Sequence, residues 1–141
     1  MIKNVYLYAK TEVLGEKFLK DTKNKYLLIG QSPFKGKIDE SGEVILPEGV
    51  KVRLQIIEDQ SEPVYDKHTG DVKDNNALET FEATIIGKNY PLPFGKGTMV
   101  SLGGFLPDYS YYIDFNFILR FNNIYEYKEV HIPQKQSTRS A

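Results

Sequence analysis

Apolar and polar side chains alternate most regularly in the middle of the chain. Every second residue from Val50 to Ile56 is apolar, whereas the positions between them are polar. Successive side chains of a strand point to opposite faces, so this period of two predicts a strand with one buried face. The same period predicts a second strand with three inward residues, Phe81, Ala83 and Ile85.

Two further segments of the second half have strand character. Thr98 to Phe105 is predicted as a strand, and Tyr111 to Tyr127 as one long strand or as two strands with a bend. In the longer segment the even positions are mainly polar, so Arg120 is expected to point outward. The odd positions are apolar or aromatic and are expected to form the core face: Tyr111, Ile113, Phe115, Phe117, Leu119 and Phe121.

Helical spacing is confined to the first part of the chain. From Thr11 to Lys23, apolar residues including Phe18 and Leu19 recur near the helical period, and Thr11 is a suitable N-cap. This pattern predicts one short amphipathic helix. The apolar and aromatic stretch from Asn4 to Tyr8 predicts either a strand or an arm that lies on another subunit.

Turn-forming residues separate these segments. Gly30 to Gly36 and Asp39 to Gly42 are predicted as turns, and Pro91 to Gly95 as a rigid turn. The polar stretch from Ser61 to Leu78 is predicted as a long hairpin tip or a mobile loop. From Pro133 onward the chain has nothing to bury and is expected to be disordered.

Length and composition indicate one mainly β domain. The 141 residues match a single core, and ten Tyr and eight Phe favour strands. The absence of Cys excludes disulfides and thiolate metal sites. Since we find no signal peptide and no run of about eighteen apolar residues, we expect a cytoplasmic protein without membrane contact. The expected parts are an arm or strand at 1–10, one domain at 11–132 and a disordered tail at 133–141.

Charge is distributed unevenly along the chain, although the total is only −1. Residues 1–37 carry a net charge of +5, residues 38–85 carry −8 and residues 86–141 carry +2. Nucleic-acid binding depends on local potential, so the total charge does not exclude it. The cationic surface is expected to come from the two ends of the chain.

Catalytic signatures are lacking. His68 and His131 are the only histidines, and neither belongs to a set with zinc-ligand spacing. The acids from Asp66 to Asp74 lack the spacing of a calcium loop, and Gly95 to Thr98 lacks the preceding glycine of a phosphate loop. We therefore expect a protein that binds a partner, without enzymatic activity, cofactor or metal.

Aromatic residues interleaved with basic ones suggest a single-stranded nucleic acid, DNA or RNA, as that partner. Such proteins stack bases on aromatic rings and neutralise the phosphates with Lys and Arg. Candidate residues of both kinds lie in predicted turns or on outward strand faces: Phe34, Lys35, Arg53, Tyr65, Lys67, Lys88, Tyr90, Phe94, Lys96, Tyr112 and Arg120.

The order of the predicted elements resembles the five-stranded OB barrel. Pro63 to Lys73 and the strand after it resemble the Asp-Lys-x-Thr-Gly hairpin of OB-fold single-stranded-DNA-binding proteins of Gram-positive conjugative plasmids and other mobile elements, the PrgE-like proteins. Lys96 to Leu102 is similar to their third strand, and Tyr112 to Ile124 to their closing strand. The resemblance implies a mainly β, five-stranded OB barrel with one short N-terminal helix. It also implies a protein that coats single-stranded DNA, with little sequence preference, during plasmid transfer or replication.

Two departures from the resemblance bear on the architecture and the partners. The tail lacks the acidic, hydrophobic tip with which related housekeeping proteins recruit partners. The segment before the closing strand is too short for the helix that commonly plugs an OB barrel, so either the helix at 11–23 takes that place or the barrel is open there.

Self-association is expected through the N-terminal arm, because its apolar residues precede the domain without an obvious strand partner. The alternative function is a protein-interaction or assembly module of a phage or plasmid, in which the exposed aromatic residues contact protein.

Overall fold

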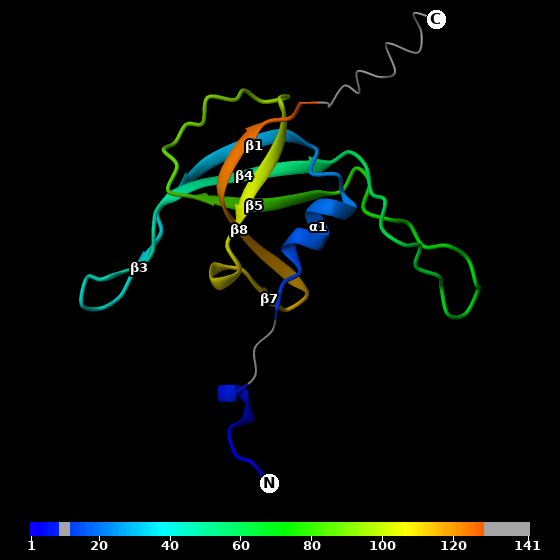
Figure 1. Cartoon of the computed structure of the whole chain (residues 1–141), viewed down its shortest axis with the longest axis horizontal. Helices are drawn as coiled ribbons and strands as arrows, with labels where there is room; N and C mark the ends of the chain where they lie inside the picture. Colours follow the sequence, from blue (N-terminus) through cyan, green and yellow to red (C-terminus); the bar gives the residue numbers. More distant parts are fainter. Residues whose placement is uncertain (9–11, 129–141) are drawn as a thin grey trace, which may run out of the picture.

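Five strands pair around a ring in the computed structural model, which describes residues 1–8 and 12–128 (Figure 1). All neighbours in the ring are antiparallel except β5 and β8, which are parallel. This arrangement is the partly open Greek-key barrel of the OB fold, and the predicted fold class is confirmed. In ring order the strands are β1 (Tyr26–Phe34), β4 (Gly49–Ile56), β5 (Thr80–Ile86), β8 (Asn116–Glu126) and β6 (Met99–Phe105).

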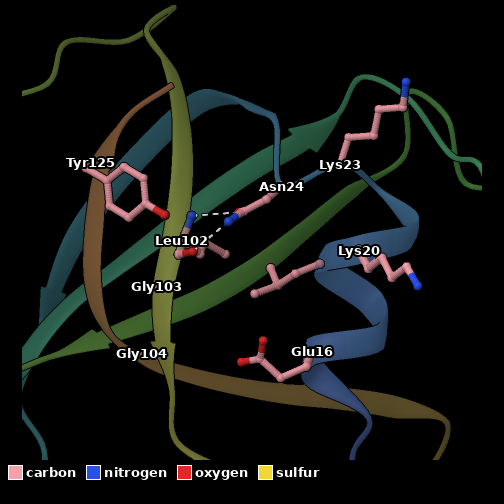
Figure 2. A pocket seen from close by; sticks show the side chains of 9 residues that line it. Glu16, Lys20, Lys23, Asn24, Leu102, Gly103, Gly104 and Tyr125 are labelled. Carbon is pink, nitrogen blue, oxygen red and sulfur yellow. Dashed lines mark hydrogen bonds between the residues drawn. The ribbon is translucent and has the colours of Figure 1, made fainter. Parts of the chain in front are cut away.

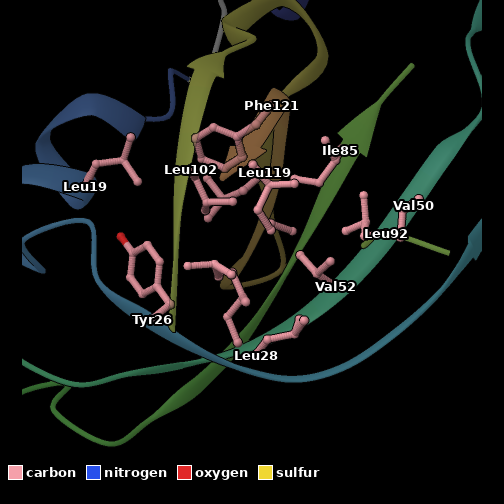
Figure 3. Close-up of a cluster of buried hydrophobic side chains, with 14 of the residues drawn as sticks. Leu19, Tyr26, Leu28, Val50, Val52, Ile85, Leu92, Leu102, Leu119 and Phe121 are labelled. Carbon is pink, nitrogen blue, oxygen red and sulfur yellow. The ribbon is translucent and has the colours of Figure 1, made fainter. Parts of the chain in front are cut away.

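The core fills the inside of this ring (Figure 3). The alternation predicted for β4 is confirmed, because Val50, Val52 and Leu54 are fully buried. Tyr26 and Phe121 add the two largest fully buried side chains. Burial of each such apolar side chain contributes roughly 1.5–3 kcal/mol to folding.

Helix α1 (Gly15–Asp21) is shorter than the helix predicted at 11–23. It begins after Leu14, which provides no side-chain cap, and the predicted N-cap Thr11 lies outside the described residues. A Cβ atom at Gly15 would collide with the Phe105 ring, so this glycine permits close packing of the helix on β6. Leu19 enters the core, and Phe18 packs against it. Of the two alternatives for this end of the barrel, a cover formed by the N-terminal helix or an open end, the structure therefore has the first.

Strand β1 extends through a segment that the sequence predicted as a turn. Gly30 to Phe34 pairs with Arg53 to Gly49, after a register shift beyond Leu28. Pro33 has no N–H group, but β6 pairs with β1 only at Tyr26 and Leu27, so no strand requires that donor. The turn predicted at 39–42 does occur, between β2 (Lys37–Ile38) and β3 (Val44–Leu46).

The long segment predicted from Tyr111 to Tyr127 is a hairpin of two strands. After the 3-10 helix η2 (Pro107–Tyr109), strand β7 (Tyr111–Ile113) pairs with the start of β8. Asp114 and Phe115 make the turn, with φ angles of 50° and 64°. This pair of positive angles is typical of the tight turns that join hairpin strands.

The expectation that all odd positions of this segment are core is wrong. Phe121 and Leu119 are buried, but Phe117 is 53% exposed and Phe115 is 92% exposed. The reason is the extent of the parallel pairing, since β5 contacts β8 only from Leu119 to Phe121. The hairpin before Leu119 lies beyond this pairing, so its apolar side chains are covered only in part, as by the edge contact of Phe117 with Phe18.

Two further described segments lie outside the barrel wall. Residues 57–79 form a long loop between β4 and β5, with an isolated bridge between Tyr65 and Val72. Residues 5–8 form a single 3-10 turn, η1 (Val5–Tyr8), so of the two alternatives for this stretch, a strand or an arm, the strand does not form. The predicted disordered tail at 133–141 lies outside the described residues. No helix within residues 1–8 and 12–128 has the length and apolarity needed to cross a membrane.

Candidate nucleic-acid interface

An OB barrel offers a defined surface to oligonucleotides. Its ligands lie on the outer face of the second and third barrel strands, between the loop that follows the first strand and the loop that precedes the last. In this chain those strands are β4 and β5. The two flanking loops are residues 35–48 and residues 106–115.

Arg120 joins the two flanking segments. Its guanidinium group lies 5.5 Å from the ring centre of Phe34, at the end of β1, and 5.8 Å from that of Tyr111, at the start of β7. The Nη1 atom donates a hydrogen bond of 2.8 Å to the carbonyl oxygen of Tyr109. These contacts within cation–π range hold both rings in place. We call Phe34, Arg120 and Tyr111 the aromatic–arginine cluster.

The expectation of an outward, solvent-exposed Arg120 is wrong. The side chain is on the outer side of the barrel, as its even position predicts, but it is only 8% exposed. Residues 106–111 fold over it, because the Leu106 N–H group donates to the Arg120 carbonyl and Ser110 Oγ accepts the Arg120 N–H. The Nε atom has no hydrogen-bond partner in the described structure. Arg120 therefore positions the two rings, and we do not assign it a phosphate contact.

Exposed cations lie on the same outer face. The strand register places Ser32, Lys51, Thr84 and Arg120 in one row across β1, β4, β5 and β8. Lys51 is exposed, and Arg53 in the next row has its guanidinium 3.9 Å from the Glu82 carboxylate. Exposed ion pairs of this kind are weak, so Arg53 stays available for a phosphate group.

Four predicted residues lie together on the loop between β5 and β6. Gln31 of β1 anchors this loop, because its side-chain amide donates to the Phe94 carbonyl and accepts the Leu92 N–H. Phe94 is half-buried and packs against the core, whereas Tyr90 is 48% exposed. The other two predicted residues of this loop, Lys88 and Lys96, are exposed.

Tyr65 and Lys67 are separated from the aromatic–arginine cluster. They lie in the loop after Ile56, at the opposite end of β4 from the loop of residues 35–48 (Figure 1). Both side chains are exposed. Asp66 accepts the N–H groups of His68 and Thr69, and these bonds lower the pKa of its carboxyl group. The Asp-Lys-x-Thr-Gly segment is thus a self-contained turn in this structure.

A second exposed surface lies at the tip of the hairpin formed by β7 and β8, which we call the hairpin tip. Tyr112, a predicted contact, is 39% exposed, and its ring packs edge-on against Phe115 and Phe117. Together with Phe81 and Ile113, these two residues line an open groove of about 450 Å³.

Sequence reasoning missed several residues of these surfaces. Lys51 shares the outward period of Arg53, so the alternation in β4 contained a signal for it. Tyr111, Phe115 and Phe117 were assigned to the core, because their position outside the barrel depends on where the parallel pairing of β8 with β5 begins.

Comparisons with known proteins add no relative. No protein-family model, curated protein or solved structure matches the chain. Within residues 1–8 and 12–128, no group of His, Cys, Asp or Glu side chains is arranged to hold a metal ion.

Proposed function

We propose that this protein binds single-stranded DNA in the cytoplasm, with little sequence preference, and coats it during plasmid transfer or replication. The observation that carries the proposal is the aromatic–arginine cluster on the ligand face of an OB barrel. Lys35, Lys51 and Arg53 surround that face with exposed positive charge.

The geometry supports stacking in preference to base reading. Rings that are already fixed lose little freedom on binding, and each stacked base contributes roughly 1–3 kcal/mol. Stacking accepts every base, because each has a π face. The exposed Lys and Arg side chains would neutralise phosphate groups and release counterions, and this effect is independent of sequence.

Fluorescence anisotropy with a labelled oligothymidine tests the proposal. We expect binding in the micromolar range or tighter at about 50 mM salt, and a steep loss of affinity as salt rises. The logarithm of the binding constant should fall linearly with the logarithm of the salt concentration, and we call the steepness of this line the salt slope. Lys51→Gln and Arg53→Gln should each lower the salt slope by about 0.7, because each removes one phosphate contact. Lys73→Gln, in the distant loop of residues 57–79, is the matched control and should leave the slope unchanged. Absence of binding to a long oligonucleotide at low salt would refute the proposal.

A protein-interaction module is the second candidate, and the hairpin tip favours it. Ile113, Phe115 and Phe117 are each more than half exposed and lie together. Contiguous exposed apolar residues mark surfaces that contact other molecules. Wild-type protein that binds no DNA, together with a Phe115→Ser variant that loses self-association, would support this candidate over the first.

A further inference from the structure

A second groove lies beside α1, away from the aromatic–arginine cluster. Two adjoining hollows of about 430 and 640 Å³ share Lys23, Asn24 and Tyr125 as lining residues. Figure 2 shows the first hollow, with α1 on one side, β6 in the centre and Tyr125 of β8 on the other side. We call the two hollows together the α1–β8 groove.

Two glycines form part of the floor of this groove. Gly103 and Gly104 of β6 lie there, and Gly104 has a φ angle of 65°, which disfavours other residues. A Cβ atom at Gly103 would lie 3.1 Å from the Tyr125 ring. A larger residue would therefore crowd the ring. Gly103 therefore lets the Tyr125 ring lie close against β6, and the exposed part of that ring is accessible to a flat group.

The walls combine aromatic rings with amines. Tyr125 is 46% exposed, and Phe94 and Tyr127 line the larger hollow beside it. The Nζ atom of Lys25 lies 5.3 Å from the centre of the Tyr127 ring. The charged lining residues are three amines, Lys20, Lys23 and Lys128, and two carboxylates, Glu16 and Glu126. Lys23 also lies 3.9 Å from the Glu58 carboxylate. With Lys25 and Glu58 included the balance remains positive, which suits a polyanion that carries planar bases.

We propose that the α1–β8 groove is a second contact segment for single-stranded DNA, in which one base stacks on Tyr125. This inference rests on the proposed function. Lys25 precedes β1, whereas Phe34 ends it, so the length of that strand, roughly 26 Å, separates the groove from the aromatic–arginine cluster. A short oligonucleotide therefore occupies only one segment, and a longer one reaches both.

Anisotropy with two oligothymidines, of about five and about sixteen nucleotides, tests this arrangement; these lengths lie near the limits of one OB fold's site size. Tyr125→Ala should weaken binding of the longer oligonucleotide by about 5- to 150-fold and leave the shorter one unchanged. Tyr125→Phe retains the ring and should bind like wild type. Unchanged melting temperatures confirm that both variants are folded.

Each other outcome has a defined meaning. Wild-type affinity of Tyr125→Ala for the longer oligonucleotide would overturn the second segment while the proposed function stands. An equal loss for both lengths would mean that Tyr125 belongs to a single binding site, which also overturns a separate segment. Failure of wild-type protein to bind either oligonucleotide would overturn the proposed function itself.

Discussion

The Tyr26 hydroxyl group is buried inside one end of the barrel. It lies 2.6 Å from Thr22 Oγ1, which in turn donates 2.8 Å to the Phe18 carbonyl oxygen. Burial raises the pKa of Tyr26 to about 12, against the opposing effect of the Thr22 hydrogen bond. In the unfolded chain the pKa of a tyrosine is about 10. The folded protein therefore keeps this proton where the unfolded chain loses it.

This pKa difference predicts a loss of stability in alkali. The contribution of Tyr26 is fully present below about pH 10 and is lost as the pH rises through about 12. By pH 11 the loss is ~1 kcal/mol. Tyr26→Phe should cost about 1 kcal/mol at pH 8 through the lost hydrogen bond, but should lose less than wild type between pH 8 and pH 11. Urea unfolding at both pH values measures this, and equal losses in the two proteins would contradict it.

At the scale of single elements, the side chains of β8 change from exposed at the start of the strand to buried at its middle. Phe121 is fully buried against Phe105, whereas Phe117 touches Phe18 and Tyr112 at its edges and is half exposed. Two phenylalanines of one strand therefore have different environments. The difference follows from the limited pairing of β8 with β5.

Alanine substitutions should separate these two environments. Phe121→Ala leaves a cavity inside the ring and should cost about 3–5 kcal/mol of unfolding free energy. Phe117→Ala removes only partial aromatic contacts and should cost less than about 1.5 kcal/mol. Urea denaturation of both variants provides the comparison. Equal losses would contradict the assignment of Phe117 to an exposed environment.

The strands that the sequence predicted best are those with one buried face. The alternation in β4 reflects a wall with core on one side and solvent on the other, and such a pattern is visible locally. In β5 the predicted inward residues Ala83 and Ile85 are buried, but so are Thr84 and Ile86. The second half of β1 carries Gly30 and Pro33, which usually mark turns, and its pairing with β4 is a contact between distant segments. The start of α1 likewise depends on the Phe105 ring, which is far away in sequence.

The candidate site was predictable only in part for the same reason. Phe34 was found because it is an aromatic residue next to a lysine, and Arg53 because it is a cation on the outward face of a strand. Arg120 was placed on the correct face, but its burial depends on residues 106–111, which fold back over it. Local alternation indicates the direction of a side chain, whereas its exposure depends on what the rest of the chain places above it.

At the scale of the whole molecule, the N-terminal arm offers exposed apolar side chains to a second copy. Four of its apolar residues are each at least 60% exposed: Ile2, Val5, Leu7 and Tyr8. We expect a chain that starts at Thr11 to form smaller assemblies than the full chain, with and without DNA, because it lacks this apolar surface. Light scattering measures the mass, and equal masses for the two chains would remove the arm from self-association.

One side chain limits how such copies could join. Where β1 and β6 part, the Asn24 amide donates to the Leu102 carbonyl and accepts its N–H, at 2.7 and 2.8 Å (Figure 2). The amide thus acts as a short piece of neighbouring backbone and satisfies groups that an unpaired strand would offer to another chain. At this gap a second molecule cannot extend the sheet by adding a strand of its own. Copies that meet at this point of β6 must therefore recognise side chains in place of backbone groups, which favours selective contacts over strand addition.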